Sequence, residues 1–150
     1  MSEAVCRDRT VWSTCWRWGP LILWMVLITG LSTEAFSEQE TGSYLLPVLR
    51  WLLPDVSPGT LDLIHGAVRK GAHVTEYAIL ALLWYRGLNW RRSGWQIGAA
   101  LSAFILAAGF GALDEAHQLF VPSRSGSIVD VGWDSLGAAL GLLSRHALRL

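Results

Sequence analysis

A run of 21 residues without a charged side chain, Ser93–Leu113, constrains the fold of this chain more than any other feature. A transmembrane helix needs about 20 mainly apolar residues to cross the hydrocarbon core of a bilayer. A second uncharged run of 16 residues, Trp18–Thr33, approaches that length and reaches it once Trp16 and its neighbours are included. The sequence therefore predicts an integral membrane protein.

The composition supports this class and excludes others. Hydrophobic residues make up 52% of the chain and charged residues only 16%, whereas soluble domains carry about 25% charged residues. This balance argues against a soluble enzyme and against a disordered chain. The formal net charge is zero, so no basic surface indicates nucleic-acid binding. A length of 150 residues favours a single domain over 1–150.

Two further apolar segments are interrupted by ionisable residues. Ala72–Leu88 contains His73 and Glu76, and Ile128–Leu143 contains two aspartates. Each would be a poor span alone, but inside a bundle the polar side chains can face inward, away from lipid. We therefore predict an all-α fold, an integral membrane bundle of four transmembrane helices with a short interfacial helix. The predicted spans cover about 16–33, 71–89, 95–119 and 128–146, with the interfacial segment at about 43–53.

The loop between the first two spans has structure of its own. Tyr44–Leu53 is apolar but too short to cross a bilayer, which is typical of an interfacial or re-entrant helix. Ser57 followed by Pro58 is a helix start, with a capping residue and then proline in the first turn. We expect a helix to run from there into the second span, with a bend near Gly66 or Gly71.

Charge asymmetry predicts the orientation. The N-terminal piece, the loop between the second and third spans and the C-terminus carry eight basic residues together, whereas the other two loops carry four. The positive-inside rule therefore predicts a multi-pass protein of the cytoplasmic (inner) membrane with both termini cytoplasmic. Tryptophans gather at the predicted inner ends, as expected at a membrane interface; they are Trp12, Trp16, Trp18, Trp84, Trp90 and Trp95.

Polar side chains recur at the outer ends of these antiparallel helices. On the second helix, their spacings of three and four residues place them on one face. The third helix ends with further polar residues, and the fourth begins with aspartates four residues apart. The topology therefore predicts one polar site in the outer half of the bundle. Its candidate members are His73, Glu76, Asp114, Glu115, His117, Gln118, Asp130 and Asp134.

Three more residues are predicted to bind a ligand at this site: Lys70, Tyr77 and Arg124. A guanidinium or ammonium group there would meet phosphate or carboxylate, which arginine binds through paired hydrogen bonds. His117 is expected to face inward because it lies three residues from Asp114, on a helix whose polar residues share a face. Gly137 and Gly141, four residues apart, are expected to allow close helix packing.

A purely structural role is the alternative for these polar groups. An aspartate or arginine at mid-membrane costs roughly 2.5–3.5 kcal/mol, and ion pairs such as Arg124 with Asp130, or His73 with Glu115, would fix the helix register. Register needs only one or two such groups, and this chain has many. Ionisable residues inside a membrane are by default a functional site, and we favour that interpretation.

Two stretches of the sequence resemble the signature of the VanZ-like family. RKGAHVTEYAILAL (69–82) is similar to its K-x-x-H-x-x-E-Y element, and LDEAHQLFVPSRSGSIVDVGWDSLGAALG (113–141) is similar to its D-E-x-x-Q-x-F-x-P-x-R element followed by D-x-x-x-N and spaced glycines. The family commonly has Asn where this chain has Asp134. The resemblance implies a small multi-pass membrane protein. The family is named for a protein linked to low-level teicoplanin resistance.

We therefore predict a cell-envelope protein whose extracytoplasmic polar pocket binds a lipid-linked or anionic envelope ligand, with an effect on teicoplanin susceptibility. The alternative is a membrane-embedded hydrolase or transferase acting on a lipid-linked substrate, with acid–base groups supplied by the same histidines and carboxylates. A transporter is a weaker third hypothesis because the inner half offers no polar path.

Partners and cofactors follow from the same residues. The predicted partner is a membrane lipid or a lipid-linked precursor, with no nucleic acid, and the sequence leaves a homo-oligomer open. No H-E-x-x-H or other specific metal motif is present, so no cofactor is predicted and no metal is assigned.

Overall fold

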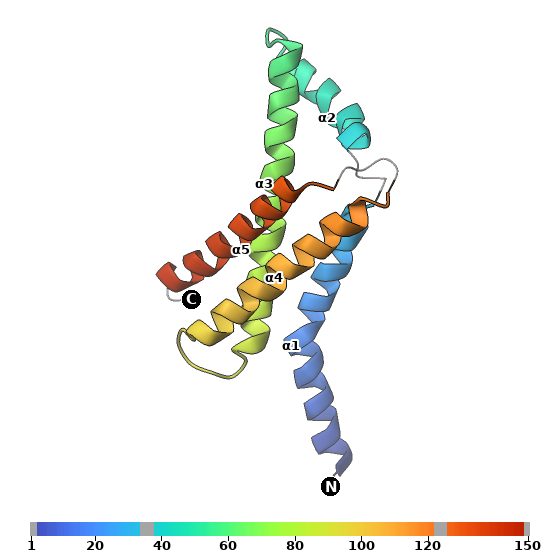
Figure 1. Cartoon of the computed structure of the whole chain (residues 1–150). Coiled ribbons are helices and arrows are strands. Elements are labelled where there is room, and N and C mark those ends of the chain that lie inside the picture. The colour runs from blue at the N-terminus through green and yellow to red at the C-terminus, as the bar shows by residue number, and fades with distance from the viewer. Residues whose placement is uncertain (1–2, 34–37, 122–125, 149–150) are drawn as a thin grey trace.

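The computed structural model describes residues 3–33, 38–121 and 126–148. The described chain is helical throughout and has no strand, so the all-α prediction is confirmed. Figure 1 shows the arrangement of the helices, which are α1 (Glu3–Leu31), α2 (Glu38–Leu52), α3 (Pro58–Leu88), α4 (Ile97–Gln118) and α5 (Ile128–Leu148).

The helix bounds agree with the sequence prediction best for α4 and α5 and least for the first two spans. α1 begins at Glu3 rather than near residue 16, because charged residues end a membrane span without ending a helix. α3 starts at Pro58, and the backbone amide of Thr60 donates to Ser57 Oγ at 3.3 Å, so the predicted cap is confirmed. The helix is continuous past both glycines where a bend was expected.

The long α3 is the central element, since it packs against each of the other four helices (Figure 1). Its 31 residues correspond to about 46 Å at 1.5 Å per residue, more than the ~30 Å hydrocarbon core of a bilayer. The first turns of α3, together with α2, extend beyond α4 and α5 (Figure 1). α3 therefore has room for one membrane-spanning part and one part outside the membrane core.

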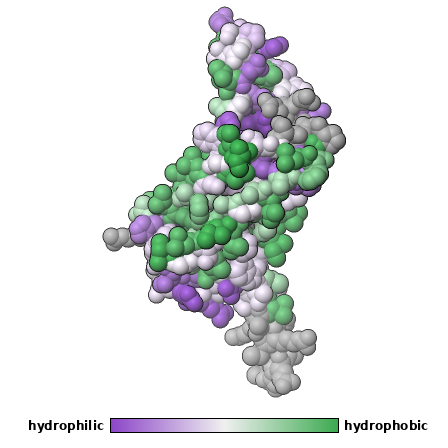
Figure 2. Space-filling view, in the orientation of Figure 1, coloured by the Kyte–Doolittle hydropathy of each residue, from purple (hydrophilic) through white to green (hydrophobic). Residues whose placement is uncertain are grey.

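The packing places small residues inside and large apolar residues outside. On α4, Ala103 and Ala107 are fully buried, whereas Ile97, Leu101 and Ile105 are exposed at four-residue spacing. Helices in lipid associate through small residues, because lipid solvates large aliphatic side chains as well as protein does. The face shown in Figure 2 carries apolar surface around its middle and polar patches toward both ends. This pattern fits a membrane environment.

Two glycines of α5 bring it against the backbone of α3. A Cβ atom on Gly137 would lie 2.3 Å from the carbonyl oxygen of Val74, and one on Gly141 would lie 2.6 Å from that of Ala78. No side chain fits at either position. The predicted close packing is confirmed, and its partner is α3.

Within the described residues, two helices are long and apolar enough to cross a membrane, Val11–Leu31 of α1 and Ile97–Gln118 of α4. α3 and α5 do not meet this standard, because charged residues interrupt their apolar sequence. Length and composition therefore support two of the four expected spans.

Candidate functional site

The helices run antiparallel, so each end of the bundle collects residues that are distant in sequence. At one end Ser32, which follows α1, donates to Asp114 near the end of α4. At the opposite end Arg17 Nε donates to the carbonyl oxygen of Gly87 at 2.8 Å. We call these the polar end and the basic end. The convergence expected from the topology is present at the polar end.

An ion pair between α3 and α5 lies at the centre of the polar end. His73 Nδ1 lies 2.9 Å from Asp134 Oδ1, and the Asp134 side chain is 1% exposed. Gly111 of α4 leaves space for this carboxylate, since a Cβ there would lie 2.9 Å from Asp134 Oδ2 and 3.0 Å from the ring of Tyr77. Three helices therefore enclose Asp134.

The last turn of α4 supplies the second part of the network. Asp114, Glu115 and Gln118 are all buried. The Gln118 side-chain amide donates to Asp114 at 3.0 Å and to Glu115 at 3.4 Å, while the backbone amide of Ser127 donates to Glu115 Oε2 at 2.8 Å. These bonds connect α4 to the start of α5 and, through Ser32, to the end of α1.

The buried part of this network is acidic. Asp114, Glu115 and Asp134 are buried carboxylates, and the buried polar side chains of the described chain include no Lys or Arg. Lys70 is 43% exposed and forms an ion pair with Asp130 at 3.3 Å, at the border of the network. His73, Glu115 and Asp134 each present one possible metal-ligand atom, and these atoms lie within 4.8 Å of one another.

Two cavities open beside the network. The first, which we call the head pocket, has a volume of about 220 Å³ and is lined by Leu31, Ser32, Thr41, Arg69, Ala72, His73 and Glu76. The second, the apolar groove, has a volume of about 530 Å³ between α2 and α3, lined by Thr41, Tyr44, Leu45, Val48, His65, Val68, Arg69 and Ala72. The two share Thr41, Arg69 and Ala72 in their walls and are therefore neighbours.

Of three further predicted site residues, one needs correction, one stays a prediction and one falls outside the described residues. His117 is exposed and does not face inward. The buried face of α4 is defined by Asp114, Glu115 and Gln118, and His117 lies about 100° around the helix from the centre of this face. Tyr77 is fully buried, with its ring near Gly111 of α4, and lines neither of these two cavities, so its role in ligand binding stays a prediction. Arg124 lies outside the described residues.

The sequence analysis missed the contact between α2 and α3. A Cβ on Gly42 would lie 3.4 Å from the His65 ring, and Thr41 Oγ1 lies 3.4 Å from His65 Nε2. α2 therefore docks on α3 and forms a wall of both cavities. The four-residue spacing of His65, Arg69 and His73 indicates a shared face of α3, but it does not indicate that α2 covers that face.

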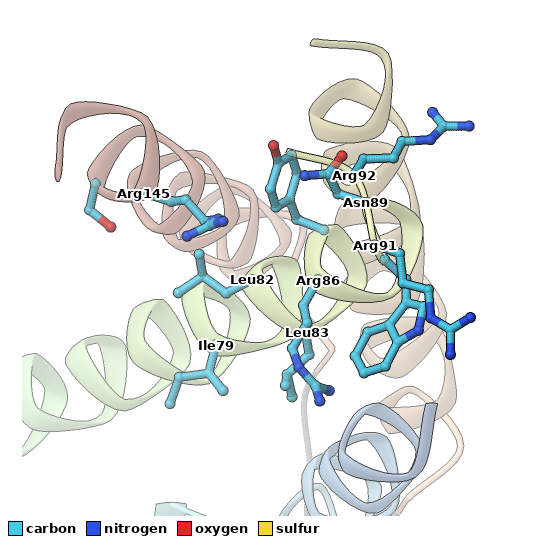
Figure 3. Close-up of a pocket in the computed structure, with 11 residues that line it drawn as sticks. Ile79, Leu82, Leu83, Arg86, Asn89, Arg91, Arg92 and Arg145 are labelled. Atoms are coloured by element: carbon cyan, nitrogen blue, oxygen red, sulfur yellow. The ribbon is translucent and has the colours of Figure 1, made fainter. Parts of the chain in front are cut away.

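The basic end carries a cleft of about 470 Å³ that is open to the surface (Figure 3). Arg145 of α5 reaches over Tyr85, with its guanidinium carbon 5.3 Å from the ring centre. Arg86 Nη2 donates to the carbonyl oxygen of Trp16 at 2.8 Å and so connects α3 to α1. Figure 3 shows Arg91 and Arg92 on the connection to α4, at one end of the cleft, and Ile79 and Leu82 of α3 toward its other end.

The aromatic side chains expected at one membrane interface gather at this basic end. The rings of Trp18 and Trp84 meet edge to face at 6.1 Å, and Trp95 stacks on Tyr85 at 4.9 Å. Such amphipathic rings suit the headgroup layer of a bilayer.

Apolar helix surfaces, small residues at the helix contacts and a buried polar network define the class of an α-helical membrane protein. The VanZ/LLP1 family model matches residues 18–149, and the chain belongs to this family. This confirms the resemblance in the two signature stretches and identifies the chain as a membrane protein of the cell envelope, in a family linked to glycopeptide resistance. Neither a curated protein nor a solved structure matches the chain.

Proposed function

We propose that this protein binds a lipid-linked, anionic ligand of the cell envelope at its polar end and in this way affects glycopeptide susceptibility. It forms one membrane domain in which α1, α3, α4 and α5 cross the cytoplasmic membrane. α2 lies at the outer interface, and both termini are cytoplasmic.

The position of the head pocket next to the apolar groove, with Thr41, Arg69 and Ala72 in the wall of both, carries this proposal. A lipid-linked ligand has a polar head and a hydrocarbon chain, and it needs a neighbouring site for each. Ser32, Arg69 and His73 offer hydrogen-bonding groups in the head pocket, and arginine binds phosphate or carboxylate through paired hydrogen bonds. Each methylene buried in the apolar groove contributes about 0.8 kcal/mol.

The packing of α3 and α5 supports four membrane crossings. Their ionisable side chains pair with each other, Lys70 with Asp130 and His73 with Asp134. The opposite face of α5 exposes Leu136, Leu140 and Leu143. Polar groups directed inward and leucines directed outward are what a helix that crosses a bilayer within a bundle requires.

The basic end supports the orientation. Its cleft gathers Arg86, Arg91, Arg92 and Arg145 beside a group of aromatic rings. An excess of basic residues is typical of the cytoplasmic side of a membrane protein. The polar end then lies on the extracytoplasmic side, where envelope precursors and glycopeptides are found.

A hydrolase or transferase acting on the same class of ligand is the second candidate. His73 lines the head pocket and is hydrogen-bonded to Asp134 on its other side. A histidine oriented by a buried carboxylate is a typical general base. In this case the ligand in the head pocket would be a substrate.

The test is a titration of the detergent-purified full chain with a short-chain polyprenyl phosphate. Arg69→Ala should weaken binding at least tenfold, because it removes the cation shared by both cavities. Arg50→Ala, an exposed arginine of α2 that lines neither cavity, is the control and should change binding less than twofold. Equal affinity of both variants and the wild type would refute the binding proposal. Phosphate release by the wild type that is lost in His73→Gln would favour the enzyme.

A further inference from the structure

We propose that His73, Glu115 and Asp134 bind one divalent transition-metal ion, of which Zn²⁺ is the best match, inside the polar end. This metal site goes beyond the proposed ligand binding and does not depend on it. Its three ligands come from three helices, α3, α4 and α5.

The geometry is close to that of a zinc site. One candidate ligand atom from each residue lies within 4.8 Å of the other two. His73 Nδ1 and Asp134 Oδ1 are 2.9 Å apart. Ligands at the usual ~2.0–2.2 Å from zinc lie about 3.3–4.2 Å apart, depending on the angle between them. Zinc binding would therefore widen the distance between His73 Nδ1 and Asp134 Oδ1 by a few tenths of an ångström and bring the more widely separated ligand atoms closer together.

The donor set favours zinc over other common ions. One imidazole nitrogen and two carboxylate oxygens are ordinary zinc ligands, and a zinc ion held by three protein groups keeps a fourth position open. Magnesium and calcium prefer sites made only of oxygen atoms.

Two buried atoms without a partner indicate that something is missing from this site. Asp134 Oδ2 and the Tyr77 hydroxyl have no hydrogen-bond partner among the described residues, and both residues are 0% exposed. The two side chains are neighbours, since Asp134 Oδ2 lies 2.9 Å and Tyr77 Cε1 3.0 Å from the Cβ position of Gly111. A buried polar group left unsatisfied costs about 1–3 kcal/mol, and more when it is charged. A metal ion bound by both carboxylate oxygens of Asp134, Oδ1 beside His73 and Oδ2, would supply the partner that Oδ2 lacks.

The balance of charge among the buried side chains also favours a bound cation. Glu115 and Asp134 are buried carboxylates, whereas Lys70 pairs with the more exposed Asp130. Asp114 accepts hydrogen bonds from Ser32 and Gln118 and is thereby satisfied. The His73 imidazole can balance at most one of the two remaining carboxylates, whereas a divalent cation would balance both and so lower the cost of burying them.

Glu115 also has the outer support that metal ligands usually have. The backbone amide of Ser127 holds Oε2 at 2.8 Å, whereas the contact of Oε1 with Gln118 is long, at 3.4 Å. Hydrogen bonds of this kind orient a ligating carboxylate and leave the other oxygen available to the ion.

The experiment measures Zn²⁺ on the full chain, purified in detergent with an affinity tag that contains no histidine. The protein is stripped with a chelator, reloaded with Zn²⁺, washed and analysed for metal. We expect about one zinc per chain in the wild type. Glu115→Gln and Asp134→Asn should each weaken binding more than tenfold, whereas Asp62→Asn, an exposed aspartate of α3, should change it less than twofold.

Less than one fifth of a zinc per wild-type chain would overturn the proposal, as would full retention of zinc in both site variants. Asp134→Asn is nearly isosteric and introduces the residue that the VanZ-like signature commonly has there, so we expect it to fold. X-ray absorption of the zinc-loaded wild type is a second measurement that needs no variant. It should show one imidazole nitrogen with oxygen ligands at about 2.0–2.2 Å, and several imidazoles or a sulfur ligand would contradict the site.

Discussion

The polar end and the basic end both concentrate charged side chains, yet the two regions differ in burial. At the polar end, Asp114, Glu115 and Asp134 are buried and are bonded across helices. At the basic end, Arg91 and Arg92 are exposed, and Arg145 is only partly covered. Charge at the polar end is therefore part of the helix packing, whereas the charge of Arg91 and Arg92 at the basic end lies on the surface of the protein.

This difference in burial predicts a difference in energetic effect. Removing one partner of a buried ion pair leaves an uncompensated charge and costs about 3–5 kcal/mol. Exposed pairs contribute about 0–1 kcal/mol each, because water and salt screen them. Substitutions at the two ends can therefore test whether the ends are as different as the structure indicates.

The largest effect is expected for His73→Ala, which leaves Asp134 buried without its partner. The free energy of unfolding in mixed micelles should fall by about 3–5 kcal/mol. Arg145→Ala is the matched change at the basic end and should cost no more than about 1 kcal/mol. Equal losses for the two variants would mean that the ends do not differ in this respect.

The next effect concerns the packing that closes the polar end. Gly137→Ala places a Cβ 2.3 Å from the carbonyl oxygen of Val74, so α5 must move away from α3. We expect a loss of about 1–3 kcal/mol in the same unfolding measurement. Gly132→Ala on the same helix is the control, since nothing lies within 4 Å of its Cβ position. A loss of unfolding free energy in Gly132→Ala as large as that in Gly137→Ala would contradict this packing.

The smallest effect is expected for Arg86→Lys at the basic end. Lysine keeps the positive charge but loses the planar group that donates to the carbonyl oxygen of Trp16. Because this contact is exposed, the free energy of unfolding should differ from that of the wild type by less than about 1 kcal/mol. A loss that matches that of Gly137→Ala would show that the basic end is also part of the packing.

Much of the fold could be predicted because uncharged runs and capping residues are local features. α4 and α5 were predicted to within two residues at each end, and the Ser57 cap was found from two adjacent residues. The convergence of charged groups at one end followed from antiparallel topology. The docking of α2 on His65 depends on a contact between distant residues, which spacing along one helix does not reveal.

The site was predictable as a set of residues but not as a geometry. Helical spacing placed His73 and Glu115 at the same end of the bundle, yet it could not show that their side chains approach Asp134 within a few ångströms. That proximity depends on Gly111 and Gly137, which let α4 and α5 close on α3. The outward position of His117 was not predicted, because its spacing of three residues from Asp114 was taken to place both side chains on one face. The direction of His117 relative to the centre of the buried face was not considered.

Native mass spectrometry of the gently purified protein tests most directly that the ligand site lies at the polar end. The measurement compares the wild type with one arginine variant from each end, Arg69→Ala and Arg145→Ala. We predict a retained lipid of anionic headgroup on the wild type and on Arg145→Ala, and its loss from Arg69→Ala. Loss from Arg145→Ala with retention on Arg69→Ala would place the ligand in the basic cleft and contradict the account.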